Sequence, residues 1–547
     1  MDIFTSVEYQ KELQNLYDLS YKSQIDSLDF MRNTNKCIIC HPTGVGKSYI
    51  GYGNMLESFV DKNIFVTASH RLMLNSQHLT NMFKLFRFLA GHIGFIFVGS
   101  DGGTLTLNKK ERKIFNNLLK DKGLNERDLI KRSTSDKEIK ELVDFHLENN
   151  RKVVIVSTYH SLGRLEGIPI DTIYCDEAHL LATPEQKTTF KTDFKKLTFE
   201  KSYFFTATPR DSFEEDTDAF LMNNKDIFGE RFGLQYRDAI DLGLIVKPII
   251  HLAIPTNYDN TKNFGTIAND CRFVIETFDN HKEWVKECSI SPNLISPKLL
   301  IKCRSVDDMW SIYKELIKKP ELSNAQIFAG ASNSDSIGGE KHKHNGVDIQ
   351  KRQDFLKKIK KLKFNEDAIV LHYDIFSEGI DVPGLTGTMF LVDNLPTKPK
   401  ILQNIGRSTR LNDDDRELLK KGIISTLDYS KWIKPHCAVI LPIMDINGEY
   451  IVQQISEMIK GLRDRYGFDP NFYVSEGNDL GKSIMDDDTD DLNEKNKKSK
   501  VNEMIKQIRQ EIEKMDANDD LIKFGLKVEM CQSEEEMIKL FEKEFGI

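Results

Sequence analysis

The stretch His41-Pro-Thr-Gly-Val-Gly-Lys-Ser48 decides the fold of this chain. It follows the apolar run Cys37-Ile-Ile-Cys40, which has the length and composition of a buried strand, and the segment from Tyr49 onward is compatible with a helix. A glycine-rich loop between a strand and a helix is the setting in which backbone N–H groups bind phosphate. The pattern therefore predicts a phosphate-binding loop, with His41 standing where the generic pattern has glycine.

The residue types within this loop each have a chemical use. Gly44 and Gly46 let the backbone turn its N–H groups toward a phosphate. Lys47 can reach the β- and γ-phosphates of a nucleotide, and the Ser48 hydroxyl can ligate Mg²⁺. The predicted nucleotide-binding residues of the loop are Thr43, Gly44, Val45, Gly46, Lys47 and Ser48.

Further short apolar runs, rich in β-branched residues and without alternation, recur along the chain. Such runs are typical of parallel strands that are buried on both faces, and helix-length segments between them indicate crossover connections. They fall into two groups, which predicts an α/β fold with two open parallel sheets flanked by helices. The runs are Ile64–Val66, Val153–Val156, Thr172–Cys175, Tyr203–Phe205, Leu299–Ile301, Ala368–Leu371, Thr388–Val392 and Ala438–Leu441.

The composition narrows the class of protein. At roughly 100–200 residues per domain, 547 residues correspond to about three to five folding units. The net charge of −8 argues against a wholly basic nucleic-acid coat protein but leaves room for a local basic groove. No apolar run approaches the ~20 residues that span a bilayer, and the start of the chain does not have the pattern of a secretory signal. With eight scattered cysteines, we expect reduced thiols and a cytoplasmic protein that is neither secreted nor bound to a membrane.

These patterns divide the chain into four parts. They are a first α/β domain (1–246), a connecting segment (247–297), a second α/β domain (298–475) and a charged linker with a helical tail (476–547). The first domain carries a charged helical insertion at about 108–152, which is either a solvated subdomain or an arm that faces a nucleic acid. The basic residues of such an arm are Lys109, Lys110, Arg112, Lys113, Lys131 and Arg132.

The tail begins with blocks of like charge and continues with apolar residues at helical spacing. This spacing predicts an amphipathic helix whose apolar face docks on another surface rather than staying free. Either the tail caps the second domain or a protein partner binds through it. The apolar residues are Val501, Met504, Ile505, Ile508, Ile512 and Met515.

A second motif, Asp176-Glu-Ala-His179, directly follows the predicted strand Thr172–Cys175. A carboxylate at the carboxyl end of a strand is where a phosphate-loop enzyme holds Mg²⁺, so Asp176 is the predicted metal residue beside Ser48. Glu177 then suits the base that orients the attacking water. A zinc site is not indicated, because no second histidine lies four residues from His179.

In their order, these motifs resemble those of superfamily 2 helicases and translocases of the DEAD/DEAH type, among them restriction-enzyme helicases and viral or phage relatives. The resemblance covers roughly residues 24–444 and implies two tandem RecA-like domains that bind ATP and Mg²⁺. The other stretches that carry it are Phe65–Gln77, Ser157–Leu162, Thr206–Thr208, Leu299–Ser305, Ser377–Pro383 and Gln403–Arg410.

The last of these stretches has a physical reading of its own. Gln403, Arg407 and Arg410 fall on one helical face at spacings of four and three. The planar fork of arginine suits charge that develops on a γ-phosphate. The resemblance implies that these side chains enter the ATP site from the second domain and complete it.

The resemblance also assigns further roles. It implies nucleotide binding by Gln24, Gly379 and Asp381, coupling of hydrolysis to domain movement by His179, Thr206 and Thr208, and contacts with a nucleic-acid backbone by Arg71, Thr158 and Arg304. One departure is His372, which stands where the family usually has threonine, two residues before Asp374.

The nucleic acid itself is less strongly indicated. Thr206-Ala-Thr-Pro209 is the form common in DNA-directed members, whereas RNA-directed members more often begin this motif with serine. DNA is therefore the preferred partner and RNA the alternative, with ATP-driven translocation better supported than unwinding. Such a protein belongs in the cytoplasm or where nucleic acid gathers in a virus-infected cell. An alternative of another class is a nucleic-acid-binding scaffold whose ATPase has decayed.

Overall fold

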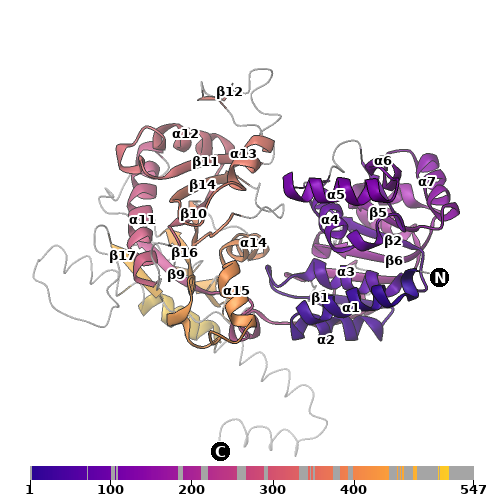
Figure 1. Cartoon of the computed structure of the whole chain (residues 1–547). Coiled ribbons are helices and arrows are strands. Elements are labelled where there is room, and N and C mark those ends of the chain that lie inside the picture. Colours follow the sequence, from indigo (N-terminus) through magenta and orange to yellow (C-terminus); the bar gives the residue numbers. More distant parts are fainter. Residues whose placement is uncertain are drawn as a thin grey trace, which may run out of the picture.

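The structure is a computed structural model. It describes residues 3–70, 72–99, 105, 107, 109–182, 189–210, 220–254, 266–288, 294–331, 343–344, 347–348, 352–373, 382–391 and 398–442. Nearer the carboxyl end it describes 452–453, 456–457, 459–460, 463, 472–476, 503 and 506–516. Within these residues, two sheets flanked by helices follow one another along the chain (Figure 1).

The first sheet has eight strands in the order β4-β3-β5-β2-β6-β7-β1-β8, and all its pairings are parallel. The strands are β1 (Lys36–Cys40), β2 (Ile64–Ser69), β3 (Ile93–Val98), β4 (Ile130–Ser133), β5 (Lys152–Thr158), β6 (Pro169–Asp176), β7 (Thr198–Thr206) and β8 (Glu230–Gly233). Because the strands are parallel, their carboxyl ends share one edge of the sheet. Cys40 pairs with Thr206 there, and Asp176 pairs with Phe205.

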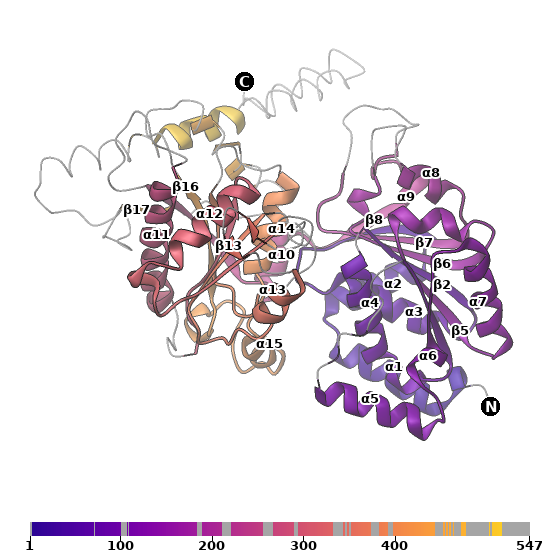
Figure 2. The same ribbon diagram turned by 90° about the horizontal axis from the view of Figure 1, so that it is seen from above.

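Helices cover both faces of this sheet (Figure 2). They are α1 (Val7–Leu19), α2 (Lys22–Arg32), α3 (Lys47–Ser58), α4 (Leu72–Leu85), α5 (Lys109–Asp121), α6 (Glu126–Leu129), α7 (Asp136–Glu148), α8 (Thr189–Lys195) and α9 (Lys225–Phe228). The next helix, α10 (Tyr236–Asp241), packs instead with residues of the second domain, among them Val439. Neighbouring residues of one strand belong to different cores, since Phe65 packs with α1 to α5 and Val66 with α7 to α9. Burial on both faces explains why the strands read as unbroken apolar runs.

The second sheet has seven strands in the order β11-β14-β10-β15-β16-β9-β17, again all parallel. The strands are β9 (Lys247–Ile254), β10 (Lys298–Cys303), β11 (Gln326–Ala331), β14 (Ala368–Tyr373), β15 (Gly387–Leu391), β16 (His436–Pro442) and β17 (Phe472–Glu476). Its helices are α11 (Ile267–Cys288), α12 (Val306–Leu316), α13 (Arg352–Ile359), α14 (Lys398–Ser408) and α15 (Asp413–Lys420). A short antiparallel pair, β12 (Lys343–His344) and β13 (Val347–Asp348), is separate from this sheet. The two parallel sheets with flanking helices confirm the predicted α/β class with tandem RecA-like domains.

The segment 247–297, expected to be a connection, contributes instead to the second sheet. It contains β9, which pairs with β16 from Lys247↔His436 to Ala253↔Pro442, and α11, which packs into the core of the second domain. This strand was not predicted from the sequence, because Pro248 and His251 interrupt its apolar run. Proline is tolerated near the start of a strand, and His251 is buried against Trp284 at 4.8 Å between ring centroids.

The insertion at about 108–152 is not only helical. Its residues Ile130–Ser133 form β4, which lies at the edge of the first sheet and pairs with β3. Lys131 and Arg132 suit an edge strand, where charged side chains deter pairing with another chain. α5 is anchored beside α4, since Phe115 packs edge-on against Phe83 at 4.5 Å and Glu111 pairs with Lys84 at 2.9 Å (Figure 1).

The described part of the tail packs on the second domain. Residues 506–516 are helical, and Ile508 and Ile512 are buried in a cluster with Val439 and Leu441 of β16. Asp516 at the end of this helix pairs with Lys460 at 2.8 Å. Of the predicted apolar face, Ile508 and Ile512 are therefore docked, whereas Val501, Met504 and Ile505 lie outside the described residues. Among the described helices, none is both long enough and apolar enough to cross a membrane.

Candidate active site

The phosphate loop leaves the carboxyl end of β1 and leads directly into α3. Gly44 and Gly46 adopt positive φ angles of 97° and 85°, a conformation that side chains disfavour. The ammonium of buried Lys47 lies inside the loop and donates to the carbonyl oxygens of His41 and Pro42, at 3.0 Å and 3.4 Å. Its positive charge is thus held at the start of α3, where the helix dipole also favours an anion.

His41 stands at the position of the first glycine of the generic loop, and its side chain is compatible with the loop conformation. Its ring is buried, and its Nε2 lies 2.8 Å from the Ser27 hydroxyl of α2, on the side away from the loop's turn. Burial, with a smaller contribution from Lys47, lowers the pKa of His41 to about 3. The histidine is therefore a neutral packing residue, and the two glycines that need positive φ are retained.

Asp176 ends β6 beside the loop, and both of its carboxylate oxygens have partners. Its Oδ1 accepts from the backbone N–H of Glu177 at 3.0 Å, and its Oδ2 accepts from the Ser48 hydroxyl at 3.3 Å. The same Oδ2 lies 3.0 Å from Nε2 of His78. Burial opposes ionisation, but His78 and Lys47 outweigh it and lower the pKa of Asp176.

The donors present here suit Mg²⁺. Ser48 and Asp176 together offer a hydroxyl and an ionised carboxylate, the hard oxygen ligands that Mg²⁺ prefers, next to a loop built for phosphate. Mg²⁺ usually takes only one or two protein ligands and completes its shell with water and substrate phosphates. The absence of any group of three histidine, cysteine or acidic residues among the described residues is compatible with that mode of binding.

Glu177 follows Asp176 in an unusual backbone conformation. Its φ of 53° is left-handed, and only Asn150 shares this feature among the described non-glycine residues. Such strain persists only where the surroundings enforce it, and it clusters at functional sites. The Glu177 carboxylate is partly exposed, and its Oε2 lies 3.5 Å from Nδ1 of His179. This geometry fits a carboxylate that must face the bound substrate rather than the core.

His179 connects three of the predicted motifs. Its Nδ1 lies 3.1 Å from the Thr206 hydroxyl, which also accepts from the backbone N–H of Thr208 at 3.0 Å. Its Nε2 lies 3.3 Å from the side-chain amide of Gln403 on α14 of the second domain. The predicted coupling residues are therefore joined by contacts, and His179 reaches the second domain through Gln403.

Helix α14 also packs directly on the phosphate loop. A Cβ added to Gly406 would lie 2.6 Å from Cβ of Thr43, so the Thr43 side chain packs against α14 where only glycine leaves room for it. Four residues further on, beyond the end of α14, Cγ of Arg410 lies 3.3 Å from the place where a Cβ on Gly44 would be. Arg407 is buried on the same helix. In both views α14 lies on the side of the second domain that faces the first (Figures 1 and 2).

A buried network of hydrogen bonds holds the carboxyl end of α14. The ammonium of Lys434 donates to the carbonyl oxygens of Ser408 and Arg410, at 2.6 Å and 2.7 Å. The Asp415 carboxylate accepts from the backbone N–H groups of Ile433 and Lys434, both at 2.8 Å. Sequence reasoning missed Lys434, because a lone lysine before a strand carries no motif.

Gln24 reaches the phosphate loop from α2. Its amide Nε2 donates to the carbonyl oxygen of Val45 at 2.9 Å, and its Oε1 accepts from the backbone N–H of Tyr21 at 3.0 Å. Tyr21 itself packs beside Lys420 of α15, whose ammonium lies 4.6 Å from the ring centroid. The loop is thus held by Gln24, and its hydrogen-bond partner Tyr21 borders the second domain.

The predicted nucleic-acid residues are only partly placed. Arg71 lies outside the described residues, as do Gly379 and Asp381, which were predicted to bind the nucleotide. Thr158 is buried at the end of β5, with its hydroxyl 3.2 Å from that of Ser161. Arg304 pairs with Asp270 and, at 3.3 Å, with Asp308, so its guanidinium is engaged within the second domain. The nucleic-acid roles of Thr158 and Arg304 stay predictions.

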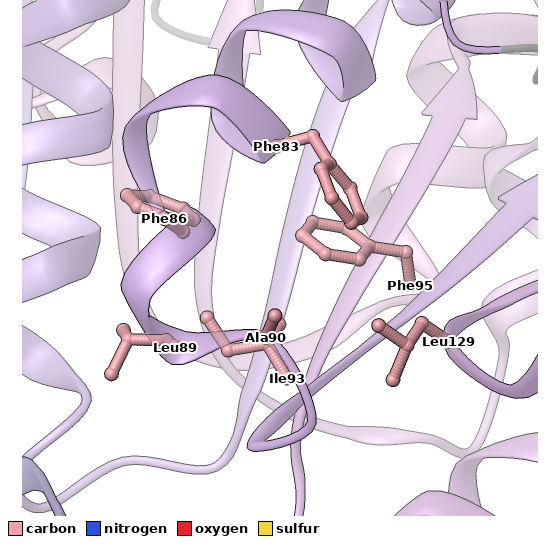
Figure 3. A pocket seen from close by; sticks show the side chains of 7 residues that line it. All are labelled: Phe83, Phe86, Leu89, Ala90, Ile93, Phe95 and Leu129. Atoms are coloured by element: carbon pink, nitrogen blue, oxygen red, sulfur yellow. The ribbon is translucent and has the colours of Figure 1, made fainter. Parts of the chain in front are cut away.

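A small apolar pocket lies in the first domain, apart from this site. Figure 3 shows its carbon-only lining from α4, β3 and neighbouring elements. It includes Ile93, at the amino end of β3, whereas the phosphate loop lies at the carboxyl ends of the strands. The lining residues are Phe83, Phe86, Leu89, Ala90, Ile93, Phe95 and Leu129. Without a polar side chain, this pocket does not suit a nucleotide.

Comparisons with known proteins agree with these motifs. Residues 4–211, less than half of the chain, match the family model described as "Type III restriction enzyme, res subunit". A search of the curated proteins found no match. In fold, the chain is similar to the ATP-dependent Type ISP restriction-modification enzyme LlaBIII bound to DNA, with a TM-score of 0.58 and 14% identity over 90% of this chain and 33% of that chain.

A weaker likeness, with a TM-score of 0.49, links the chain to S. cerevisiae Dbp5 bound to RNA and ADP BeF3, at 12% identity over 86% of this chain and 93% of that chain. The chain spans about a third of the length of the restriction-modification enzyme. The matched segment lies in the first domain and the likeness in fold extends over both domains, which is in keeping with the helicase-like family that the motifs resemble.

Proposed function

We propose that this protein is a nucleic-acid-dependent ATPase of the DEAH-type helicases that hydrolyses ATP between its two domains and uses the energy to move along DNA. The observation that carries the proposal is the set of contacts between the two domains at the phosphate loop. Gln403 and Gly406 of α14, and Arg410 just beyond its end, meet His179, Thr43 and Gly44 of the first domain. A site assembled from two domains is what couples hydrolysis to domain movement.

The residues take distinct roles in this proposal. The loop amides and the Lys47 ammonium bind the phosphates, and Glu177 orients the attacking water at the γ-phosphate. Mg²⁺, held by Ser48 and Asp176, supplies positive charge to the phosphate oxygens. Arg407 and Arg410 stabilise the negative charge that develops as the bond to the leaving ADP breaks.

DNA is the preferred nucleic-acid partner, and movement along the DNA is better supported than separation of its strands. Support for DNA comes from Thr206 at the start of the coupling motif and from the family match to a restriction-enzyme subunit. RNA is the alternative partner. A scaffold with a decayed ATPase is disfavoured, because the loop lysine, both acidic residues and both arginines are present.

A trapping variant tests the proposal. Glu177→Gln keeps the side-chain volume but removes the base, so ATP and nucleic acid should stay bound together while turnover falls about 10²-fold or more. The measurement is the dissociation rate of a fluorescent DNA strand in the presence of ATP and Mg²⁺. Glu166→Gln, an exposed glutamate of the same domain, is the matched control. Release from Glu177→Gln at the rate of the unmodified protein would rule out the catalytic-base role.

A further inference from the structure

The Asp176 carboxylate has a buried partner that none of the motifs contains. His78 lies in the second turn of α4, and its Nε2 is 3.0 Å from Oδ2 of Asp176. Its other ring nitrogen, Nδ1, lies 2.5 Å from the hydroxyl of Tyr52 on α3. Both side chains are buried, and their rings meet edge-on at 5.9 Å between centroids. Three elements therefore converge on one carboxylate.

The chemistry of the three groups fixes the direction of these hydrogen bonds. The Tyr52 hydroxyl, like phenols in general, keeps its proton at neutral pH and can donate. A neutral imidazole whose Nδ1 accepts from that hydroxyl carries its own proton on Nε2. Nε2–H then faces Oδ2 of Asp176 at 3.0 Å, a close charge contact rather than a well-aligned hydrogen bond. Tyr52 thus selects the tautomer in which His78 serves the carboxylate.

The carboxylate is consequently held at both oxygens before any ligand is considered. The Glu177 N–H holds Oδ1, while Ser48 and His78 hold Oδ2. Ser48 belongs to the phosphate loop and is itself a predicted Mg²⁺ ligand, so it is not a support independent of the metal. Among the described side chains that lie outside the motifs, His78 alone contacts this carboxylate within hydrogen-bond distance.

We propose that His78, held by Tyr52, is a positioning residue that sets the orientation of the Asp176 carboxylate for Mg²⁺. This inference rests on the proposed function, since it presumes that Asp176 serves a metal–nucleotide complex. Partners of metal-binding carboxylates fix their direction, and their loss typically weakens metal affinity ten- to a hundredfold. The position of His78 has a second consequence. Helix α4 begins at Leu72, inside the stretch Phe65–Gln77 that carries part of the family resemblance. His78 therefore links this stretch to the Asp176 carboxylate.

The test is the Mg²⁺ dependence of nucleotide binding, which needs no turnover. Binding of a fluorescent, non-hydrolysable ATP analogue is titrated with Mg²⁺ in the full chain. His78→Leu should raise the Mg²⁺ concentration for half-maximal binding about ten- to a hundredfold. Tyr52→Phe, which removes only the hydroxyl, should shift it less in the same direction. His78→Gln retains an amide N–H and should recover part of the loss.

The matched control is His146→Leu. His146 is a second buried histidine of the first domain, on α7 at the other face of the sheet, and its loss should leave the Mg²⁺ dependence unchanged. Thermal unfolding establishes which variants are folded. If His78→Leu does not fold, the Mg²⁺ titration of Tyr52→Phe tests the inference in its place.

The inference is overturned if folded His78→Leu or Tyr52→Phe requires the same Mg²⁺ concentration as the unmodified chain. It is also overturned if His146→Leu shifts the titration equally, because the effect would then come from any buried cavity. If the unmodified chain itself binds the analogue without regard to Mg²⁺, the proposed function fails together with this inference.

Discussion

The two halves of the candidate site are built in different ways. In the first domain, the phosphate loop, Asp176 and His78 contact one another within one sheet and its helices, and Lys47 is bonded to the carbonyls of its own loop. In the second domain, the functional side chains come from α14 and from Arg410 just beyond its end, and Lys434 donates to backbone carbonyls at that end. The half that binds nucleotide is therefore assembled locally, whereas the half that completes the site depends on how the domains meet.

Removal of an arginine from the second half should have the largest effect. Arg407→Ala should lower ATP turnover by about 10³- to 10⁵-fold, the usual contribution of an arginine that stabilises phosphoryl transfer, and should leave ATP binding nearly unchanged. Steady-state turnover and analogue binding measure the two quantities separately. Arg127→Ala, an exposed arginine of α6, is the control. A loss of nucleotide binding in Arg407→Ala would place this residue in the binding half instead.

Loss of the loop lysine, unlike loss of Arg407, should weaken nucleotide binding as well as turnover. Lys47→Ala removes the cation that faces the phosphates, so both nucleotide binding and turnover should fall, turnover by roughly 10²- to 10³-fold. The same two assays measure the result. Near-normal turnover would end the identification of this loop as a phosphate site.

The contact between the halves can be altered without removing any charged group. Gly406→Ala places a methyl group within 2.6 Å of the Thr43 side chain, which forces α14 away from the loop. A displacement of about 1 Å can cost up to about a hundredfold in rate, so turnover should fall while analogue binding persists. The control is Gly422→Ala, although its positive φ of 65° adds some backbone strain. Unchanged turnover in Gly406→Ala would show that hydrolysis does not require this contact.

Removing Lys434, which bonds to the carboxyl end of α14, should lower turnover less than changing a residue of α14 itself. Lys434→Met removes an ammonium that donates to two backbone carbonyls, and it should destabilise the second domain by about 1.5–3 kcal/mol. Turnover should fall roughly tenfold, because Arg410 is then held less firmly. Urea unfolding and turnover report the two effects. A stability loss with full turnover would mean that Lys434 serves only folding.

The smallest effect concerns a lysine stripe on α5, defined as Lys109, Lys113 and Lys120, which share one exposed helical face. If this stripe binds a DNA backbone, replacing all three by glutamine should reduce the slope of log K against log salt by about 0.9 for each phosphate that a lysine had neutralised. Lys137, Lys140 and Lys225, exposed on helices of the other face, form the matched triple control. Equal slopes in the unmodified chain and the stripe variant would make the insertion a solvated subdomain.

The sequence predicted the local features well, because they depend on residues that are close along the chain. The loop glycines, Asp176 at a strand end and the spacing of Gln403 and Arg407 on one helix all follow from local geometry, whereas the expectation that Arg410 shares this helical face is wrong, because α14 ends at Ser408. His78, Tyr52 and Lys434 could not be found in this way. Their roles arise from packing between elements far apart in sequence, and each residue type alone is most often structural.

The strands that were missed have a similar explanation. β4 is a charged edge strand, and β9 carries a proline and a buried histidine, so neither has the unbroken apolar run by which the other strands were recognised. The segment 247–297 was therefore expected to be a connection. Only the pairing partners, β3 for β4 and β16 for β9, identify these segments as strands.

The central claim is that nucleic acid and ATP hydrolysis are linked through a site shared by two domains. The most direct measurement is the ATPase rate of the full chain with single- and double-stranded DNA and with single- and double-stranded RNA. The proposal predicts that DNA raises turnover, and raises it more than RNA does. Stimulation by RNA alone would reverse the DNA preference, and a rate that no nucleic acid changes would contradict the account.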